Sequence, residues 1–183
     1  MSGLHFDIDG VQLDAVSAEL EATPRQVKLA FHAALRRTAT TLRTLSARGL
    51  AGELQLRTIS LLRKRLKSLK LKRGADGVTL WYGLNDMPAS WFKGTPTQDS
   101  TGASMRGQHI TGAFVARSKF KGRKTMFKRD GKARLHIQEQ NLGVGDQALV
   151  YVEDRIFTQT ETIFWKNFTR ELNARVRYKI GAA

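Results

Sequence analysis

Few side chains of this chain have the type and spacing that catalysis or metal binding requires. The 183-residue sequence contains no cysteine, which excludes disulfide bonds, thiolate metal sites and cysteine nucleophiles. No serine-nucleophile motif occurs, and Gly143-Val144-Gly145 lacks the remaining residues of a phosphate-binding loop. The four histidines occur in none of the spacings typical of zinc sites: His5, His32, His109 and His136. We therefore predict a protein that is not an enzyme and that carries no cofactor.

A pair of carboxylates near the start is the nearest approach to a cation site. Phe6-Asp7-Ile8-Asp9-Gly10 resembles a short strand, along which Asp7 and Asp9 would share one face. Hard cations such as Mg²⁺ usually gather more oxygen ligands than two, and no third ligand is evident. We predict no metal here. His32, next to Phe31 on an expected helix, is predicted to be structural.

Charge is distributed unevenly along the chain, whose formal net charge is +15. Residues 1–22 form an acidic segment without lysine or arginine, whereas two later blocks are strongly basic. Such a pattern favours contact with a polyanion or with a neighbouring subunit, and solvation of exposed faces is the alternative. The residues expected to make these contacts are Arg63, Lys64, Arg65, Lys67, Lys70, Lys72 and Arg73 in the first block, and Lys119, Lys121, Arg123, Lys124, Lys128, Arg129 and Lys132 in the second.

Helices are predicted near both ends of the chain. Thr23, Pro24 and Gln26 form a helix start with a capping box, and apolar residues then recur at three- and four-residue steps up to Gly49. A shorter helix is expected at 58–66. Gly145-Asp146 precedes a third helix, over 146–172, with a broad apolar stripe that includes Leu149. The segment 175–180 is interpreted as an edge strand.

Strands are predicted between these helices, at 68–72, 78–84, 112–118, 124–128 and 134–140. Asp130-Gly131 is a strong hairpin signal between the last two. We expect one antiparallel sheet of about four to five strands. The chain is long enough for one domain, residues 1–183, with an α+β fold: a long N-terminal helix and a C-terminal helix packed on the sheet.

The segment 86–109 shows no periodic pattern and is predicted to be a long flexible loop. Loops of this length are uncommon in compact domains and are often functional. It contains Trp91 and Phe92, which we interpret, together with Met87 and Pro88, as an interface with another subunit. The alternative is that Trp91 and Phe92 fold back onto the core of the chain itself.

Several short motifs resemble the minor tail protein Z family of long-tailed bacteriophages, which are tail completion proteins near the head–tail joint. They are the strand ending Gly83-Leu84-Asn85, the strand Gly-Ala-Phe-Val-Ala-Arg at 112–117, and the hairpin Phe-Lys-Arg-Asp-Gly at 127–131. The helix containing Ala34-Leu35-Arg36-Arg37-Thr38 and the closing helix take the places of the family's first and last helices. The resemblance covers most of the chain from about residue 23.

The resemblance implies a structural virion protein that completes the tail or neck, forms a ring at the head-proximal end of the tail, and helps join head to tail and position the DNA end. Its partners would be copies of itself, in a hexameric ring, together with the tail terminator or tail tube and the head-completion or connector proteins. The resemblance also implies that the protein contacts genome DNA without sequence specificity. We expect assembly in the bacterial host cytoplasm, because no secretory signal or membrane span is evident.

The alternative function is a free, sequence-independent nucleic-acid-binding protein that uses the two basic blocks. The sequence does not indicate which block would face DNA, the ring stoichiometry, the order of the neck partners, the host, or whether the tail contracts.

Overall fold

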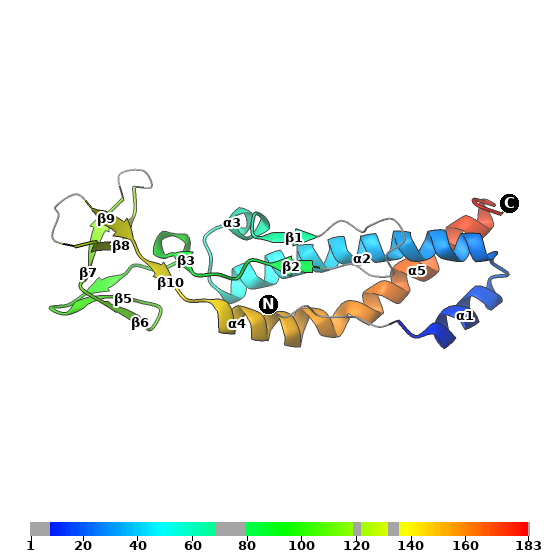
Figure 1. The fold of residues 1–183 in the computed structure, drawn as a ribbon, viewed down its shortest axis with the longest axis horizontal. Coiled ribbons are helices and arrows are strands. Elements are labelled where there is room, and N and C mark those ends of the chain that lie inside the picture. Colours follow the sequence, from blue (N-terminus) through cyan, green and yellow to red (C-terminus); the bar gives the residue numbers. More distant parts are fainter. Residues whose placement is uncertain (1–7, 69–79, 119–121, 132–135, 183) are drawn as a thin grey trace. The chain divides into compact units, whose positions relative to one another are not determined.

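The computed structural model describes residues 8–68, 80–118, 122–131 and 136–182 and confirms the α+β class (Figure 1). The chain divides into two compact units. The first comprises Met1–Arg48, Arg63–Gly83 and Tyr151–Ala183, and the second comprises Gly49–Leu62 and Leu84–Val150. The single domain expected from the length of the chain stays a prediction.

The first unit is mainly helical. It contains α1 (Gly10–Glu19), most of α2 (Pro24–Glu53) and α5 (Thr160–Arg177). The predicted strand 78–84 is confirmed by β2 (Leu80–Tyr82), which pairs antiparallel with β1 (Leu66–Ser68), whereas residues 69–72 of the predicted strand 68–72 lie outside the described residues. Helices therefore supply the framework of this unit.

The capping box that begins α2 is confirmed. The amide of Gln26 donates to Thr23 Oγ1 at 3.3 Å, and the amide of Thr23 donates to Gln26 Oε1 at 3.0 Å. These bonds satisfy two of the free amide groups at the start of the helix. The helix continues past Gly49 to Glu53, because burial of Leu50 and Ala51 outweighs the weak helix propensity of glycine.

The core of the first unit lies between α2 and α5. Its central side chains are fully or almost fully buried, and α1 and Trp165 pack around them: Ala30, Ala34, Leu35, Phe164, Phe168 and Leu172. The rings of Phe164 and Phe168 are stacked with centroids 5.9 Å apart, and Phe31 meets Phe164 edge-on at 5.7 Å. The large aromatic side chains of α5 thus pack against small residues of α2.

Polar contacts also connect α2 to α5. The buried Glu171 carboxylate pairs with Arg37 Nε at 2.5 Å and with Arg175 Nη1 at 2.5 Å. Asn167 Nδ2 donates to Thr38 Oγ1 at 3.1 Å. A buried carboxylate needs such partners, because an unpaired one would be costly.

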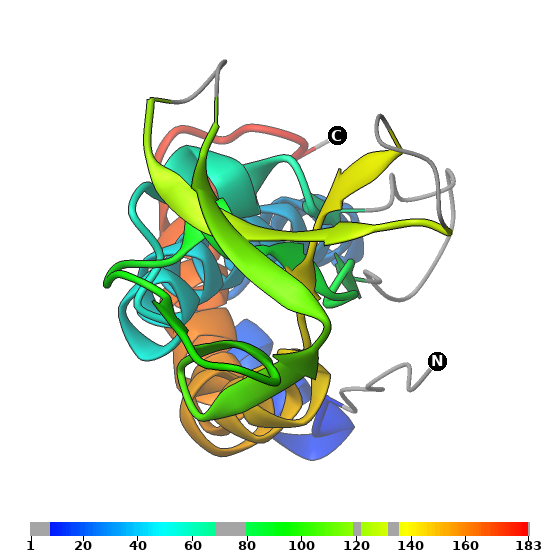
Figure 2. The same ribbon diagram turned by 90° about the vertical axis from the view of Figure 1, so that its left-hand side faces the viewer.

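The second unit carries most of the strands, in three small antiparallel sheets (Figure 2). β3 (Met87–Pro88) pairs with β10 (Asn141–Leu142). The sheet β4–β5–β6 comprises Thr97–Gln98, Gly102–Met105 and Gln108–Thr111, and the sheet β7–β8–β9 comprises Ala113–Arg117, Lys124–Arg129 and Ile137–Glu139. The remaining elements are α3 (Ile59–Arg63), the 3₁₀ turn η1 (Ala89–Trp91) and α4 (Gly145–Tyr151).

Two sequence predictions about this unit are wrong. A single sheet of four to five strands is replaced by separate sheets of two or three, partly because Gly112 (φ 72°) turns the chain between β6 and β7. The segment 86–109 is not a loop, since it contains β3, η1, β4, β5 and the start of β6. Its strands are short and built largely from small and polar residues, so they give no alternating pattern to detect.

The closing segment also differs from prediction. The helix expected over 146–172 is interrupted by a π-helical turn, Val152–Ile156, and a 3₁₀ turn, Phe157–Gln159. Because a π turn changes the helical spacing, Val152 and Ile156 are buried while Leu149 is 40% exposed. The edge strand expected over 175–180 is wrong, because α5 continues to Arg177 and ends in a turn.

The start of the described chain is a helix rather than a strand. Asp9 is the N-cap of α1, and its carboxylate accepts a hydrogen bond from Val11 N at 2.9 Å. Asp7 lies outside the described residues. Among the helices that the structure describes, none combines the length and the apolar character that a bilayer crossing requires.

Candidate functional site

The residues predicted to form an interface lie mostly inside the second unit. Phe92 and Met87 are 0% exposed, and Trp91 and Pro88 are half-buried. The alternative that Phe92 folds back onto the core of the chain itself is therefore confirmed, and the buried Met87 side chain likewise belongs to that core. An interface role for Trp91 and Pro88 stays a prediction.

Phe92 is held by the end of α2 and by an arginine that the sequence did not single out. Phe92 forms an isolated bridge with Leu56, and the Arg106 guanidinium lies 5.0 Å from the centre of its ring. Arg106 also donates to the carbonyl of Leu54, and burial lowers the pKa of its guanidinium while the charge of Glu53 opposes that shift. A cation over an aromatic ring is favourable and here fixes the hairpin to the helix end.

The turn that presents Arg106 is a two-residue hairpin between β5 and β6. Met105 is paired with Gln108, and both Arg106 (φ 55°) and Gly107 (φ 75°) adopt left-handed conformations. Positive φ at both central positions is characteristic of a type I′ turn, whose twist matches antiparallel strands. Arg-Gly is a weak signal for this turn in a sequence, which explains why the hairpin was missed.

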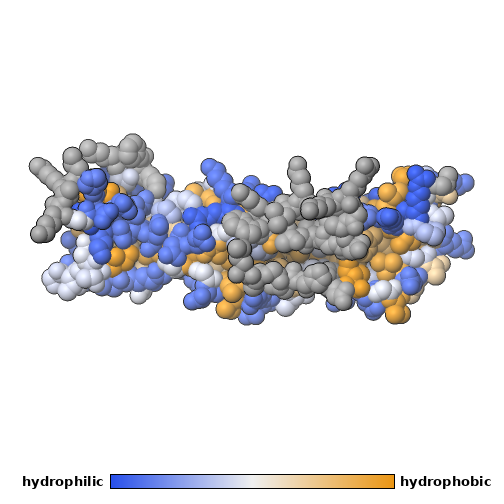
Figure 3. Space-filling view, in the orientation of Figure 1, coloured by the Kyte–Doolittle hydropathy of each residue, from blue (hydrophilic) through white to orange (hydrophobic). Residues whose placement is uncertain are grey.

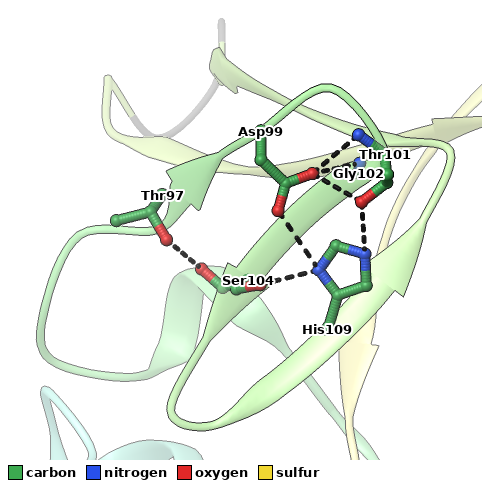
Figure 4. A network of polar contacts seen from close by, with 6 residues as sticks. All are labelled: Thr97, Asp99, Thr101, Gly102, Ser104 and His109. Atoms are coloured by element: carbon green, nitrogen blue, oxygen red, sulfur yellow. Dashed lines mark hydrogen bonds and ion pairs between the residues drawn. The ribbon is translucent and has the colours of Figure 1, made fainter.

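A polar network spans β4, β5 and β6 (Figure 4). Asp99 Oδ1 accepts hydrogen bonds from the Thr101 amide at 2.7 Å, the Thr101 hydroxyl at 2.7 Å and the Gly102 amide at 2.8 Å. His109 Nδ1 lies 2.8 Å from Ser104 Oγ, and His109 Nε2 lies 3.2 Å from Thr101 Oγ1. His109 Nδ1 also lies 3.7 Å from Asp99 Oδ2, and the tautomer of the imidazole decides which ring nitrogen donates.

The network brings a serine, a histidine and an aspartate together, but it is exposed to solvent. The side chains of His109 and Asp99 are 37% and 55% exposed. The hydrogen bonds from the Thr101 hydroxyl, then those from the Thr101 and Gly102 amides, hold the pKa of the Asp99 carboxyl below its ordinary value. Nucleophilic sites rely on excluding water, which strengthens their electrostatics. We interpret the network as an Asx-type turn that fixes the connection from β4 to β5.

The predicted basic residues fall in several places. Arg63 and Lys64 are exposed at the end of α3, Arg65 is half-buried, and Lys67 belongs to β1. Arg123, Lys124, Lys128 and Arg129 are exposed on and beside β8. The remaining predicted residues lie outside the described part of the chain: Lys70, Lys72, Arg73, Lys119, Lys121 and Lys132.

The strand register adds Arg117 to the second basic group. Arg117 on β7 stands directly opposite Lys124 on β8, and Lys128 lies on the same face as Lys124 four pairs further along. Like charges directly opposite each other in a sheet are destabilising. We call Arg117, Arg123, Lys124, Lys128 and Arg129 the basic hairpin. Only the strand register shows that Arg117 lies opposite Lys124.

Within the residues that the structure describes, no group of three or more potential metal ligands comes together. The basic hairpin is thus the strongest candidate surface for a ligand, because it concentrates exposed charge of one sign. Comparison of the chain with family models, with curated proteins and with solved structures finds no match.

Proposed function

We propose that this chain is a structural virion protein of a tailed bacteriophage, a tail completion or neck component that forms a ring at the head-proximal end of the tail. In this role it helps join head to tail and position the DNA end. The observation that carries the proposal is the order of the elements on which the resembling motifs lie. The motif from Ala34 to Thr38 lies on α2, and the Gly83-Leu84-Asn85 motif directly follows β2. The motif at 112–117 includes β7, and the motif at 127–131 covers the end of β8. The closing helix α5 comes after all of them.

A polyanion contact on the basic hairpin supports the same role. Arg117 opposite Lys124 costs stability in the isolated chain, and a phosphate backbone between or above them would relieve this repulsion. The contact would be independent of base sequence, because phosphates carry no sequence information directly. In the proposed ring the basic hairpin contacts genome DNA or an acidic neighbouring protein.

The test is cryo-electron microscopy of tailed particles assembled with the chain, with tails assembled without it as the control. We expect a ring of added density at the head-proximal end, of sixfold symmetry as the family resemblance implies. A single asymmetrically placed copy, or tails that join heads normally without the chain, would contradict the proposal.

The second candidate function is free, sequence-independent binding of nucleic acid, favoured by the same pairing of like charges. A salt titration of the purified chain with two DNA duplexes of unrelated sequence distinguishes it. A free binder should lose affinity with a log–log slope of about −0.9 per phosphate contacted, equally for both duplexes. Affinity that is negligible at low salt would exclude this candidate and leave assembly as the role of the charges.

A further inference from the structure

The first unit exposes an apolar group beside the start of α2. Tyr178 is 67% exposed, Ile180 53% and Leu29 40%. We call these three residues the apolar knob. The turn that carries Ile180 is held against the start of α2, because Ile180 N donates to Arg175 O at 2.9 Å and Thr23 Oγ1 donates to the carbonyl of Gly181 at 3.3 Å.

The same unit contains a groove between α1 and α2 with a volume of about 540 Å³. Leu13 of α1 and Val27 and Phe31 of α2 give it an apolar lining, and Asp14 and Lys28 stand among its polar residues. Figure 3 shows apolar side chains gathered at the surface around α1 and the start of α2. None of the knob residues lines the groove, so the two features occupy different surfaces of the unit.

The α1 side of the groove and the flank of the knob carry opposite charge, while Lys28 adds one positive charge on the α2 side of the groove. The chain from residue 8 to residue 23, which forms the α1 side of the groove, contains acidic residues and no basic one: Asp9, Asp14, Glu19 and Glu21. The knob is flanked by Arg177 and Lys179, both exposed. Opposite charges at the edge of an apolar contact favour one orientation and one partner.

We propose that the apolar knob of one copy docks in the α1–α2 groove of a second copy of this chain. The proposal rests on the ring assembly proposed above and names the contact that would build it. Because knob and groove are different surfaces, the contact is heterologous, and successive copies form a ring when their rotation closes. A second copy is favoured over a small ligand because the chain itself supplies both the apolar insert and the matching charges.

The absence of cysteine allows a direct test by disulfide cross-linking. The full-length Ile180→Cys variant is mixed with the full-length Ser17→Cys variant, whose new thiol lies in the groove. The mixture is then oxidised at increasing protein concentration. Thr162→Cys is the matched control for the groove position, because it places a thiol at an exposed hydroxyl residue of α5 in the same unit. We expect the 180–17 heterodimer to exceed the 180–162 heterodimer roughly tenfold, the effect of one well-placed aromatic anchor.

A second substitution tests the apolar contact itself. Tyr178→Ser in the Ile180→Cys chain should reduce the 180–17 product roughly tenfold, whereas Leu149→Ser, at an exposed leucine of α4, should not. Equal yields with the groove and control thiols, or a dominant 180–180 homodimer, would overturn the proposal. Cross-linking uses the purified chain, so it is independent of the electron microscopy of tails. A ring on the tail without the 180–17 cross-link would overturn the proposed contact but not the proposed function. The 180–17 cross-link without a ring on the tail would overturn the proposed function but not the contact.

Discussion

At the scale of single residues, three helices end on a non-glycine residue in the left-handed conformation. Glu21 (φ 49°), Gln55 (φ 47°) and Lys179 (φ 52°) follow α1, α2 and α5. Each lies in a pair of backbone bonds of the Schellman type; after α2 these run from Leu56 N to Ala51 O and from Gln55 N to Gly52 O. Glycine is the usual residue there, because a side chain in this conformation is strained.

Replacing Gln55 by glycine should therefore stabilise the chain. Gln55 is exposed, so little packing is lost, and relief of the left-handed strain should raise the free energy of unfolding by about 1 kcal/mol relative to Gln55→Ala. Urea denaturation of the two variants measures this difference. Equal stability of the glycine and alanine variants would show that the turn is not strained.

A second residue-scale prediction concerns Glu171. Burial raises the pKa of this carboxyl, but the hydrogen bond from Arg175 and the charges of Arg37 and Arg175 outweigh burial, so the pKa is lowered overall. A lowered pKa in the folded state means that the carboxylate stabilises the fold above its ordinary pKa, and that this stability is lost as the pH falls through the folded value.

Glu171→Gln should accordingly cost about 2 kcal/mol near neutral pH, where the charged hydrogen bonds are lost. The difference from the unmodified chain should shrink below about pH 4, where glutamate itself becomes protonated. Unfolding free energies at several pH values measure it, with Glu161→Gln, at an exposed position of α5, as the control. A difference that is independent of pH would contradict the pairing of Glu171 with the two arginines.

At the scale of elements, the segment that contains η1 belongs to the fold of the second unit. Phe92→Ala should cost about 3–5 kcal/mol of unfolding free energy, because it empties a fully buried site and removes the ring beneath Arg106. Trp91→Ala, at the half-buried neighbouring position, should cost much less. Thermal and urea denaturation compare the two, and equal costs would show that Trp91 is also part of the core.

Reversing one charge on the hairpin β7–β8 should make the isolated chain more stable but weaken its binding to DNA. Lys124→Glu replaces a like-charge pair with an opposite-charge pair across from Arg117, so it should stabilise the isolated chain by about 0.5–1 kcal/mol. It should also weaken binding to duplex DNA and lower the salt slope by about one. Lys128→Glu is the control: Lys128 faces Ala113, so its reversal should weaken binding without the gain in stability. Loss of stability in Lys124→Glu would contradict the pairing.

At the scale of the whole molecule, the sequence predicts helices better than sheets. The capping box and the three- and four-residue spacing located α2, and the strands β7 and β8 were placed close to their observed bounds. The short strands β3, β4, β5 and β6 were missed, because too few side chains alternate to give a pattern. The contact of Arg106 with Phe92 joins positions distant in sequence, which no local pattern reveals.

The contrast between a 30-residue helix and strands of two residues has a further consequence, for the exchange of backbone amide hydrogens with solvent. Central amides of α2 and α5 are bonded within helices that share a fully buried core, so only large openings should release them. Amides of β4 and of the β3–β10 pair can open with the loss of a few bonds. Hydrogen–deuterium exchange should therefore be slowest in α2 and α5 and fastest in these short pairs, and uniform protection would contradict this.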